Sequence, residues 1–230
     1  ITLRRGEVVG IAGLIGAGRT ELCMSVFGKA YGAKISGEIR IDGRPVALDS
    51  VSDAIANGLA YITEDRKGDG LVLMDTIKRN TTLSRLDFVS DRGIIDVDKE
   101  QHAAEEYRQK LDIKAPSVEQ IVGNLSGGNQ QKVLVGKWMF AKPDIMMLDE
   151  PTRGIDVNAK YEIYCIINDL VRQGKSILMV SSELPEILGM CDRIYVMCEG
   201  RIVGELSKEE ATQEIIMDKI MQASKGEVGQ

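Results

Sequence analysis

Short apolar runs bounded by polar and glycine-rich segments recur along the 230-residue chain. Four of these runs span only four or five positions, a length typical of strands that are buried on both faces of a sheet. They lie at residues 7–11, 59–62, 145–148 and 176–180. Stretches with apolar residues at helical spacing lie between them, so the pattern predicts an α/β fold with a mostly parallel sheet flanked by helices.

Turn signals within this pattern predict an additional antiparallel portion. Residues 35–46 alternate in polarity around the strong turn signal Asp42-Gly43, and residues 193–205 have the pattern of a second hairpin. Ser207 and Glu210 then have the spacing of a capping box, which predicts the start of the last helix.

A more polar and helical region follows the second apolar run. Asp96 or Asp98 can cap a helix that continues to about Leu111, with Ala103 and Tyr107 on the same face as Leu111.

A glycine-rich segment, Gly13-Leu14-Ile15-Gly16-Ala17-Gly18-Arg19-Thr20, follows the first apolar run. It has the spacing of the phosphate-binding P-loop, G-x-x-x-x-G-K-[ST], except that Arg19 replaces the lysine. Glycines let the backbone curl around phosphate oxygens, and the next helix points its N–H groups at them. A strand-to-helix turn of a different nucleotide-binding fold is the alternative. Arginine keeps the positive charge in a wider, planar group, so we expect nucleotide binding to survive.

A second glycine turn lies within Asn124–Lys132, where Ser126, Gly127 and Gly128 directly precede a helical pattern. A hydroxyl, backbone N–H groups and the positive end of a helix dipole favour a phosphate group. An ordinary glycine-rich helix cap is the alternative.

Two carboxylates, Asp149 and Glu150, end the apolar run at 145–148. A buried parallel strand delivers such residues to the edge of the sheet where ligands bind in doubly wound folds. The alternative is that they cap the following turn.

These segments together resemble the P-loop, the signature motif and the Walker B strand of ATP-binding-cassette (ABC) ATPases, and Gly154–Asp156 resembles their D-loop. The resemblance implies that ATP binds this chain's own P-loop and that Asp156 takes part in the contact with a partner domain. The alternative role of Asp156 is to N-cap a helix over residues 157–173, and the two roles are compatible. We call residues 124–132 the signature turn and Gly154–Asp156 the D-loop segment.

The resemblance also assigns roles to particular residues. It implies that Glu150 orients or deprotonates the attacking water, and that Asp149 and Thr20 hold Mg²⁺. The residues implied to contact this chain's own nucleotide are Gly13, Gly16, Ala17, Gly18, Arg19 and Thr20. The residues implied to complete the ATP site of a partner are Ser126, Gly127, Gly128 and Asn129.

Three positions depart from the family pattern. Arg19 replaces the P-loop lysine, Glu64 takes the place of a glutamine that contacts Mg²⁺ or the attacking water, and Ser182 takes the place of a histidine at the γ-phosphate. Serine donates a hydrogen bond but carries no charge and cannot handle a proton as histidine does. The departures point to an impaired ATP site on this chain.

The arginine in the P-loop, Thr63–Lys67, the signature turn and residues 151–156 together resemble the second ATPase half of bacterial monosaccharide importers of the ribose, galactose, arabinose or xylose kind. That resemblance implies one ABC domain over residues 1–230 with a helical subdomain at about 71–140. It also implies a companion cassette fused upstream, transmembrane permease subunits, and a peripheral place on the cytoplasmic face of the bacterial membrane. A regulatory nucleotide-binding module and a DNA-repair or chromosome-structuring ATPase are the alternatives.

Composition narrows these possibilities. The formal net charge of -6 argues against a general nucleic-acid surface, and no apolar run is long enough for direct insertion into a membrane. Four cysteines without C-x-x-C spacing and one histidine make a zinc site implausible. Because Ile1 is not an initiator methionine, we expect the chain to be an excised or processed piece of a longer protein.

Overall fold

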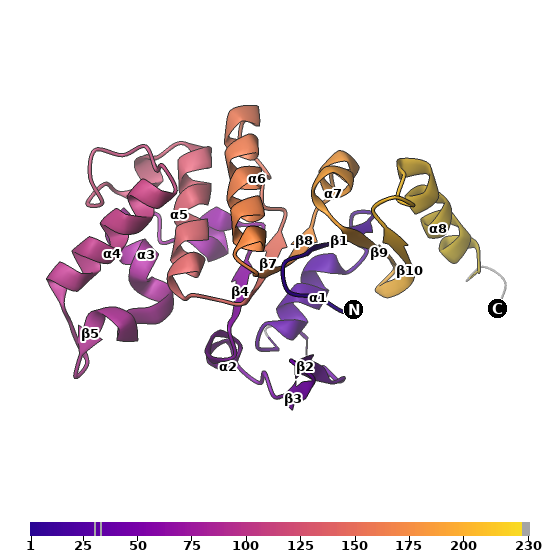
Figure 1. Ribbon diagram of the computed structural model, residues 1–230, viewed down its shortest axis with the longest axis horizontal. Coiled ribbons are helices and arrows are strands. Elements are labelled where there is room, and N and C mark those ends of the chain that lie inside the picture. The colour runs from indigo at the N-terminus through magenta and orange to yellow at the C-terminus, as the bar shows by residue number, and fades with distance from the viewer. Residues whose placement is uncertain (30, 33, 227–230) are drawn as a thin grey trace. The chain divides into compact units, whose positions relative to one another are not determined.

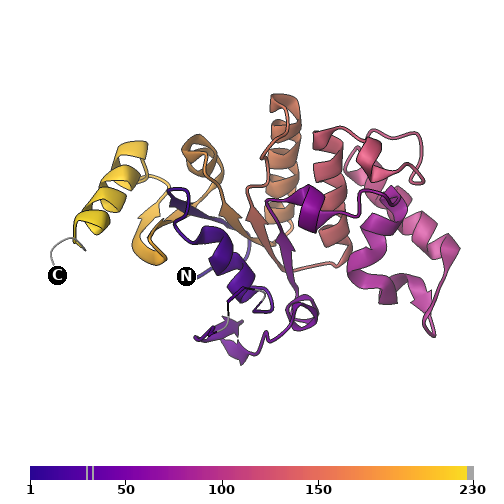
Figure 2. The same cartoon turned by 180° about the vertical axis from the view of Figure 1, so that it is seen from behind.

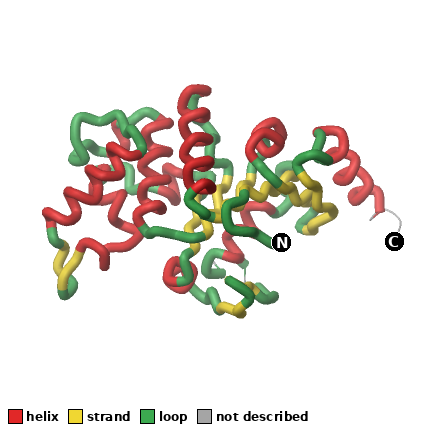
Figure 3. The backbone as a smooth tube through the Cα atoms, viewed as in Figure 1, coloured by secondary structure: helices red, strands yellow, loops and turns green. Residues whose placement is uncertain are grey.

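The computed structural model describes residues 1–29, 31, 32 and 34–226, and the chain divides into two compact units. The first unit comprises Ile1–Tyr61, Asp144–Glu150 and Asp169–Gln230, and the second comprises Ile62–Pro143 and Pro151–Asn168. Strands dominate the centre of the first unit, whereas the second is mainly helical (Figure 3).

The central sheet has six strands in the order β10-β9-β1-β8-β7-β4. Their bounds are β1 Val8–Gly13, β4 Leu59–Ile62, β7 Ile145–Asp149, β8 Ser176–Val180, β9 Arg193–Cys198 and β10 Arg201–Ser207. The pairs β1–β8, β1–β9 and β7–β8 are parallel, and β9–β10 is antiparallel. The predicted α/β class with a mostly parallel sheet is therefore confirmed.

Strand register brings three chain segments to one edge of this sheet. Val180 pairs with Ile11 of β1 on one side and with Asp149 of β7 on the other. Because parallel strands end at the same edge, the P-loop after β1, the carboxylates after β7 and Ser182 after β8 all emerge there.

Helices cover both faces of the sheet. Figures 1 and 2 show α1 (Arg19–Val26) below the strands and α7 (Leu184–Met190) above them. The last helix, α8 (Gln213–Gly226), packs against β9 and β10. The short helix α2 (Val51–Ala56) begins at Ser50, whose side chain accepts a hydrogen bond from the backbone N–H of Asp53.

Two local predictions need correction in this unit. The first hairpin is shorter than the 35–46 pattern suggested, because its strands are only β2 (Ile39–Ile41) and β3 (Arg44–Val46). Glu210 does accept hydrogen bonds from the backbone N–H and the hydroxyl of Ser207, but they close a turn. Helix α8 starts later, and the Thr212 hydroxyl accepts from the N–H of Ile215 in its first turn.

The second unit is built from short helices. Their bounds are η1 Arg66–Gly70, α3 Ile77–Thr82, η2 Leu83–Val89, α4 Val97–Lys110, η3 Val122–Asn124 and α5 Gly127–Phe140, with a small hairpin of β5 Ser90–Asp91 and β6 Ile94–Ile95. The long helix α6 (Val157–Arg172) begins in this unit and ends in the first.

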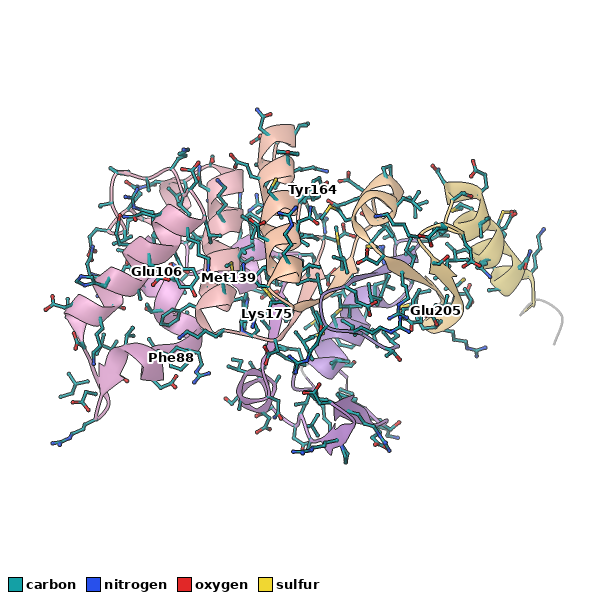
Figure 4. The ribbon with its side chains drawn as sticks, viewed as in Figure 1. Phe88, Glu106, Met139, Tyr164, Lys175 and Glu205 are labelled. Atoms are coloured by element: carbon teal, nitrogen blue, oxygen red, sulfur yellow. The ribbon has the colours of Figure 1, made fainter. Side chains whose placement is uncertain are left out.

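Helices α3, α4 and α5 pack against one another in this second unit. The buried hydroxyl of Tyr107 donates to the carbonyl oxygen of Met139 at 3.0 Å, and burial raises the pKa of Tyr107 to about 12. Figure 4 shows Met139 on α5 and Glu106 on α4. Asp96 is the N-cap of α4. Ala104, Tyr107 and Leu111 are buried, and Ala103, one turn before Tyr107 on the same face, is half-buried. No helix in the described part of the chain combines the length and apolarity needed to cross a membrane.

Candidate functional site

The P-loop segment forms a tight turn between β1 and α1. Gly16 and Gly18 adopt positive φ angles of 81° and 93°, a conformation that residues with a Cβ rarely take. The backbone of Ala17 lies between them, and its carbonyl oxygen accepts from the N–H of Gly200 at 2.8 Å. At the end of β1, a Cβ on Gly13 would come within 2.5 Å of the Met197 carbonyl oxygen. The turn is thus held against the β9–β10 hairpin, and the N-terminal end of α1 follows it.

Arg19, the first residue of α1, is buried inside the first unit with only 7% of its surface exposed. Its Nη1 donates to the carbonyl oxygen of Ser181 at 2.5 Å, and its Nη2 lies 3.7 Å from Oε1 of Glu150. The guanidinium group is therefore directed at the ends of β7 and β8. A compact lysine ammonium could not hold the carbonyl and the carboxylate in the same forked arrangement.

Glu150 sits in a strained backbone position directly after β7. Its φ angle is +48°, and its N–H donates to the carbonyl oxygen of Val180 at 2.8 Å. Non-glycine residues held in this region cluster at functional sites. Its carboxylate accepts a hydrogen bond from the Ser182 hydroxyl at 3.1 Å and faces the Arg19 guanidinium. One carboxylate thus has a cation and a hydroxyl as partners.

Asp149 is fully buried at the end of β7, and its Oδ2 accepts a hydrogen bond from the Tyr61 hydroxyl at 3.0 Å. Thr20 lies half-buried in the first turn of α1. Within the described residues, no group of three or more His, Cys, Asp or Glu side chains could enclose a metal ion. Mg²⁺ at phosphates uses one or two protein oxygens together with phosphate and water oxygens. The donor set of one carboxylate and one hydroxyl fits Mg²⁺ that binds together with a nucleotide.

The signature turn lies in the second unit. Ser126 caps α5, and its hydroxyl oxygen accepts from the side-chain amide of Asn129 at 2.9 Å. The other end of the Asn129 side chain accepts from the backbone N–H of Lys114 at 2.8 Å. In this structure, Asn129 therefore stabilises the turn itself.

The two glycines of this turn face different neighbours. A Cβ on Gly128 would come within 2.5 Å of the Ala159 Cβ, so this glycine permits close packing between α5 and α6. A Cβ on Gly127 would lie 2.9 Å from Nη2 of Arg66 and 3.2 Å from the carbonyl oxygen of Gly154. The D-loop segment therefore lies beside the first glycine of the signature turn.

Asp156 ends the D-loop segment and begins α6. Its Oδ1 accepts from the backbone N–H of Ala159 at 3.0 Å, as expected for a helix N-cap. Glu64 also belongs to the second unit, where its carboxylate lies 3.4 Å from the Thr63 hydroxyl that donates to it. The structure therefore brings Arg19, Glu150 and Ser182 together in one unit, and places Glu64 and Asp156 in the other.

A family model described as ABC transporter matches residues 1–153. The chain belongs to the ABC transporter family. The P-loop and the Asp149–Glu150 edge described above therefore lie in the part of this ABC domain that matches the family.

Relatives of this ABC domain have names that refer to sugar transport. It is 64% identical over 217 residues to the L-arabinose transport ATP-binding protein AraG of Geobacillus stearothermophilus, covering 94% of this chain and 42% of that protein. It is 58% identical over 215 residues to the xylose import ATP-binding protein XylG of Moorella thermoacetica, with the same coverage. The ribose import ATP-binding protein RbsA of Clostridium perfringens is 50% identical over 217 residues, 94% of this chain and 43% of its own length. The chain thus spans less than half the length of these relatives.

Solved structures show the same fold for this ABC domain. A nucleotide-free ATP-binding cassette from an ABC transporter superposes with a TM-score of 0.75 at 18% identity, covering 96% of this chain and 87% of the other. The ADP conformation of the ATP-binding cassette MJ1267 gives a TM-score of 0.76 at 20% identity, covering 100% of this chain and 91% of the other.

Two residues of this ABC domain escaped the sequence interpretation. The Tyr61 hydroxyl contacts Asp149 from a strand that carries no motif, so no local signal marked it. Arg66 lies in the segment Thr63–Lys67, which contributed to the family resemblance without a role for this residue. Asp65 accepts from the N–H groups of Lys67 and Gly68, so it marks a turn here but does not single out Arg66.

Proposed function

We propose that this chain is the second ATP-binding half of a bacterial monosaccharide importer, peripheral to the cytoplasmic face of the membrane and coupled to permease subunits. Its signature turn completes the ATP site of a companion cassette fused upstream. Its own P-loop binds ATP with Mg²⁺, and ATP at this site is hydrolysed slowly. The sugar-import names of the relatives, at 50–64% identity over 94% of this chain, support the class of transport.

The observation that supports different roles for the two ATP sites is the pairing of Glu150 with Arg19 and Ser182. A carboxylate whose oxygens already have a hydroxyl and a buried cation as partners has fewer free acceptor positions with which to orient an attacking water. The signature turn, by contrast, keeps its serine cap and both glycines. The signature turn, which matches the family pattern, therefore serves the companion's ATP. Arg19 and Ser182, which depart from the pattern, affect the nucleotide on this chain's own P-loop.

The proposed mechanism rests on contacts that ATP makes with both cassettes and that are lost after hydrolysis. Only the γ-phosphate of ATP reaches from the P-loop of one cassette to the signature turn of the other, so ATP favours the closed pair and hydrolysis releases it. The positive end of α5 and the N–H groups beside Gly127 supply the donors on this chain. Closure and opening then drive the permease between its inward-facing and outward-facing states.

The test compares two substitutions in the full-length protein reconstituted with its permease. Gly127→Arg places a large side chain where backbone must approach a phosphate, and we expect it to abolish most ATP turnover and sugar uptake. Gly189→Arg is the matched control, because Gly189 is exposed on α7 and a Cβ there meets nothing within 4 Å. Glu150→Gln should reduce ATP turnover and sugar uptake less than the equivalent change in the companion. If Gly127→Arg leaves uptake at the level of the control, the proposed division of labour is wrong.

A regulatory module without turnover is the second candidate, and the Arg19–Glu150 pair favours it. Phosphate release measured with and without the companion cassette separates the two functions. If this chain is only a regulatory module, no phosphate is released from ATP bound to its own P-loop. The companion cassette then releases phosphate even when the signature turn of this chain is altered. The chromosome-structuring alternative requires a long coiled coil between P-loop and signature turn. The longest helix that the structure describes there is α4, with 14 residues.

A further inference from the structure

Arg66 lies in one loop of the second unit and contacts two others, the D-loop segment and the signature turn. It is the first residue of η1, directly after the Thr63–Asp65 segment that follows β4. Asp65 caps this turn by accepting hydrogen bonds from the N–H groups of Lys67 and Gly68 through Oδ1. The backbone that carries Arg66 is therefore held in place locally, and its side chain extends toward the D-loop segment.

The guanidinium group binds two consecutive carbonyl oxygens, those of the residue just before that segment and of its first residue. Nη1 donates to the carbonyl of Arg153 at 2.7 Å, and Nη2 donates to the carbonyl of Gly154 at 3.1 Å. Gly154 has a φ angle of +68°, so the chain turns sharply here. A planar fork with parallel donors suits two neighbouring acceptors, which a single ammonium cannot reproduce.

The same guanidinium group also contacts the signature turn. Nη2 lies 2.9 Å from the position of a Cβ on Gly127, and Nε lies 3.5 Å from Oε1 of Gln130. Gln130 is itself buried and donates to the carbonyl oxygens of Val122 and Leu125. Arg66 thus connects the D-loop segment with the first turn of α5, on the side where Gly127 leaves room for it.

Burial lowers the pKa of Arg66, while the nearby charge of Asp65 acts in the opposite direction. An arginine remains charged under all ordinary conditions, so the partly buried cation needs its carbonyl partners. The neighbouring Lys67 carries the same charge but is exposed. Geometry, and not charge alone, therefore distinguishes Arg66 from the rest of its loop.

We propose that Arg66 is a positioning residue that holds the D-loop segment and the signature turn in a single arrangement, so that both meet the companion's nucleotide together. This inference rests on the proposed function, because it concerns the ATP site that this chain completes for its companion. Without the guanidinium group, the Arg153 and Gly154 carbonyls lose their shared partner, and the two loops move independently. ATP still binds the companion's P-loop, but the closed arrangement that hydrolyses it forms less often.

The experiment uses the full-length transporter and measures the ATP dependence of phosphate release for Arg66→Ala, Arg66→Lys and Lys67→Ala. We expect Arg66→Ala to lower kcat at least about tenfold, which corresponds to loss of one or two charge-assisted hydrogen bonds, with KM for ATP changed less than about twofold. Arg66→Lys should restore part of the rate, because an ammonium reaches one carbonyl. Lys67→Ala, the matched loss of charge, should behave as wild type.

Gly127→Arg is included to separate this inference from the proposed function. If Gly127→Arg abolishes turnover while Arg66→Ala matches Lys67→Ala, Arg66 has no positioning role and the proposed function stands. If Gly127→Arg is harmless, the proposed function fails and this inference fails with it. Should Arg66→Ala not fold, Arg66→Lys decides alone. An intermediate kcat with unchanged KM supports the inference, and a wild-type kcat overturns it.

Discussion

The shared contacts of Glu150 predict that restoring activity at the proposed ATP site of this chain requires two changes. Arg19→Lys alone leaves the Ser182 hydroxyl on the carboxylate, and Ser182→His alone leaves the buried guanidinium beside it. Neither single variant frees the carboxylate and supplies a γ-phosphate contact at once. We therefore expect each to raise the hydrolysis at this site less than about threefold, and the double variant to raise it at least about thirtyfold.

The magnitude follows from the geometry. Two unit charges 3.7 Å apart attract by on the order of 4 kcal/mol at an effective dielectric constant near 20, before desolvation is subtracted. Neighbouring groups that share one partner couple by about 0.5–3 kcal/mol in double-mutant cycles. If each single change gives about threefold, additivity predicts about ninefold. A thirtyfold gain exceeds that value by about 0.7 kcal/mol, which lies within the range for coupled groups.

The assay is single-turnover phosphate release by the full-length protein, in a background where the companion lacks its own matching catalytic carboxylate. Wild type, both single variants and the double variant complete the cycle. ATP binding by calorimetry controls for loss of affinity. Strict additivity of the two changes, or a tenfold gain from Arg19→Lys alone, would refute the argument that Glu150 is held by both partners.

Three further predictions concern other parts of the domain. Thr20→Ala should weaken Mg²⁺-dependent ATP binding while leaving Mg²⁺-free binding unchanged, and calorimetry with and without Mg²⁺ checks this. Tyr107→Phe removes the buried hydrogen bond to Met139 and should lower the free energy of unfolding by about 1 kcal/mol in urea titrations. Cys165 is exposed, whereas Cys191 is buried and its pKa is raised by burial. A thiol reagent at pH 8 should therefore label Cys165 rapidly and Cys191 only after denaturation, and equal labelling rates would contradict the packing.

The sequence by itself determined the features that depend on neighbouring residues. Gly16 and Gly18 mark positions where the backbone needs positive φ angles, and Asp156 and Ser126 mark helix starts through side chains that accept nearby N–H groups. The apolar run ending in Asp149 predicted a buried strand from its length alone. These signals act within about four residues, so they can be recognised without knowledge of the fold.

Only the tertiary structure decided contacts between residues that are distant in the sequence. The strand order places Val180 beside Asp149, and this pairing brings Ser182 to Glu150. The hydroxyl of Tyr61 reaches Asp149 across 88 positions of sequence. No periodicity encodes which strands become neighbours, because that choice minimises the exposed apolar surface of the whole unit.

Arg66 is the clearest example of a residue whose contacts the sequence alone does not predict. Within the charged run Thr63–Lys67, nothing in the sequence distinguishes it from Lys67, since both are cations beside a helical turn. The fold places the carbonyls of Arg153 and Gly154 within reach of one of them and leaves the other exposed. The partners that define Arg66 lie 87 and 88 residues away, so its role arises only when the chain folds.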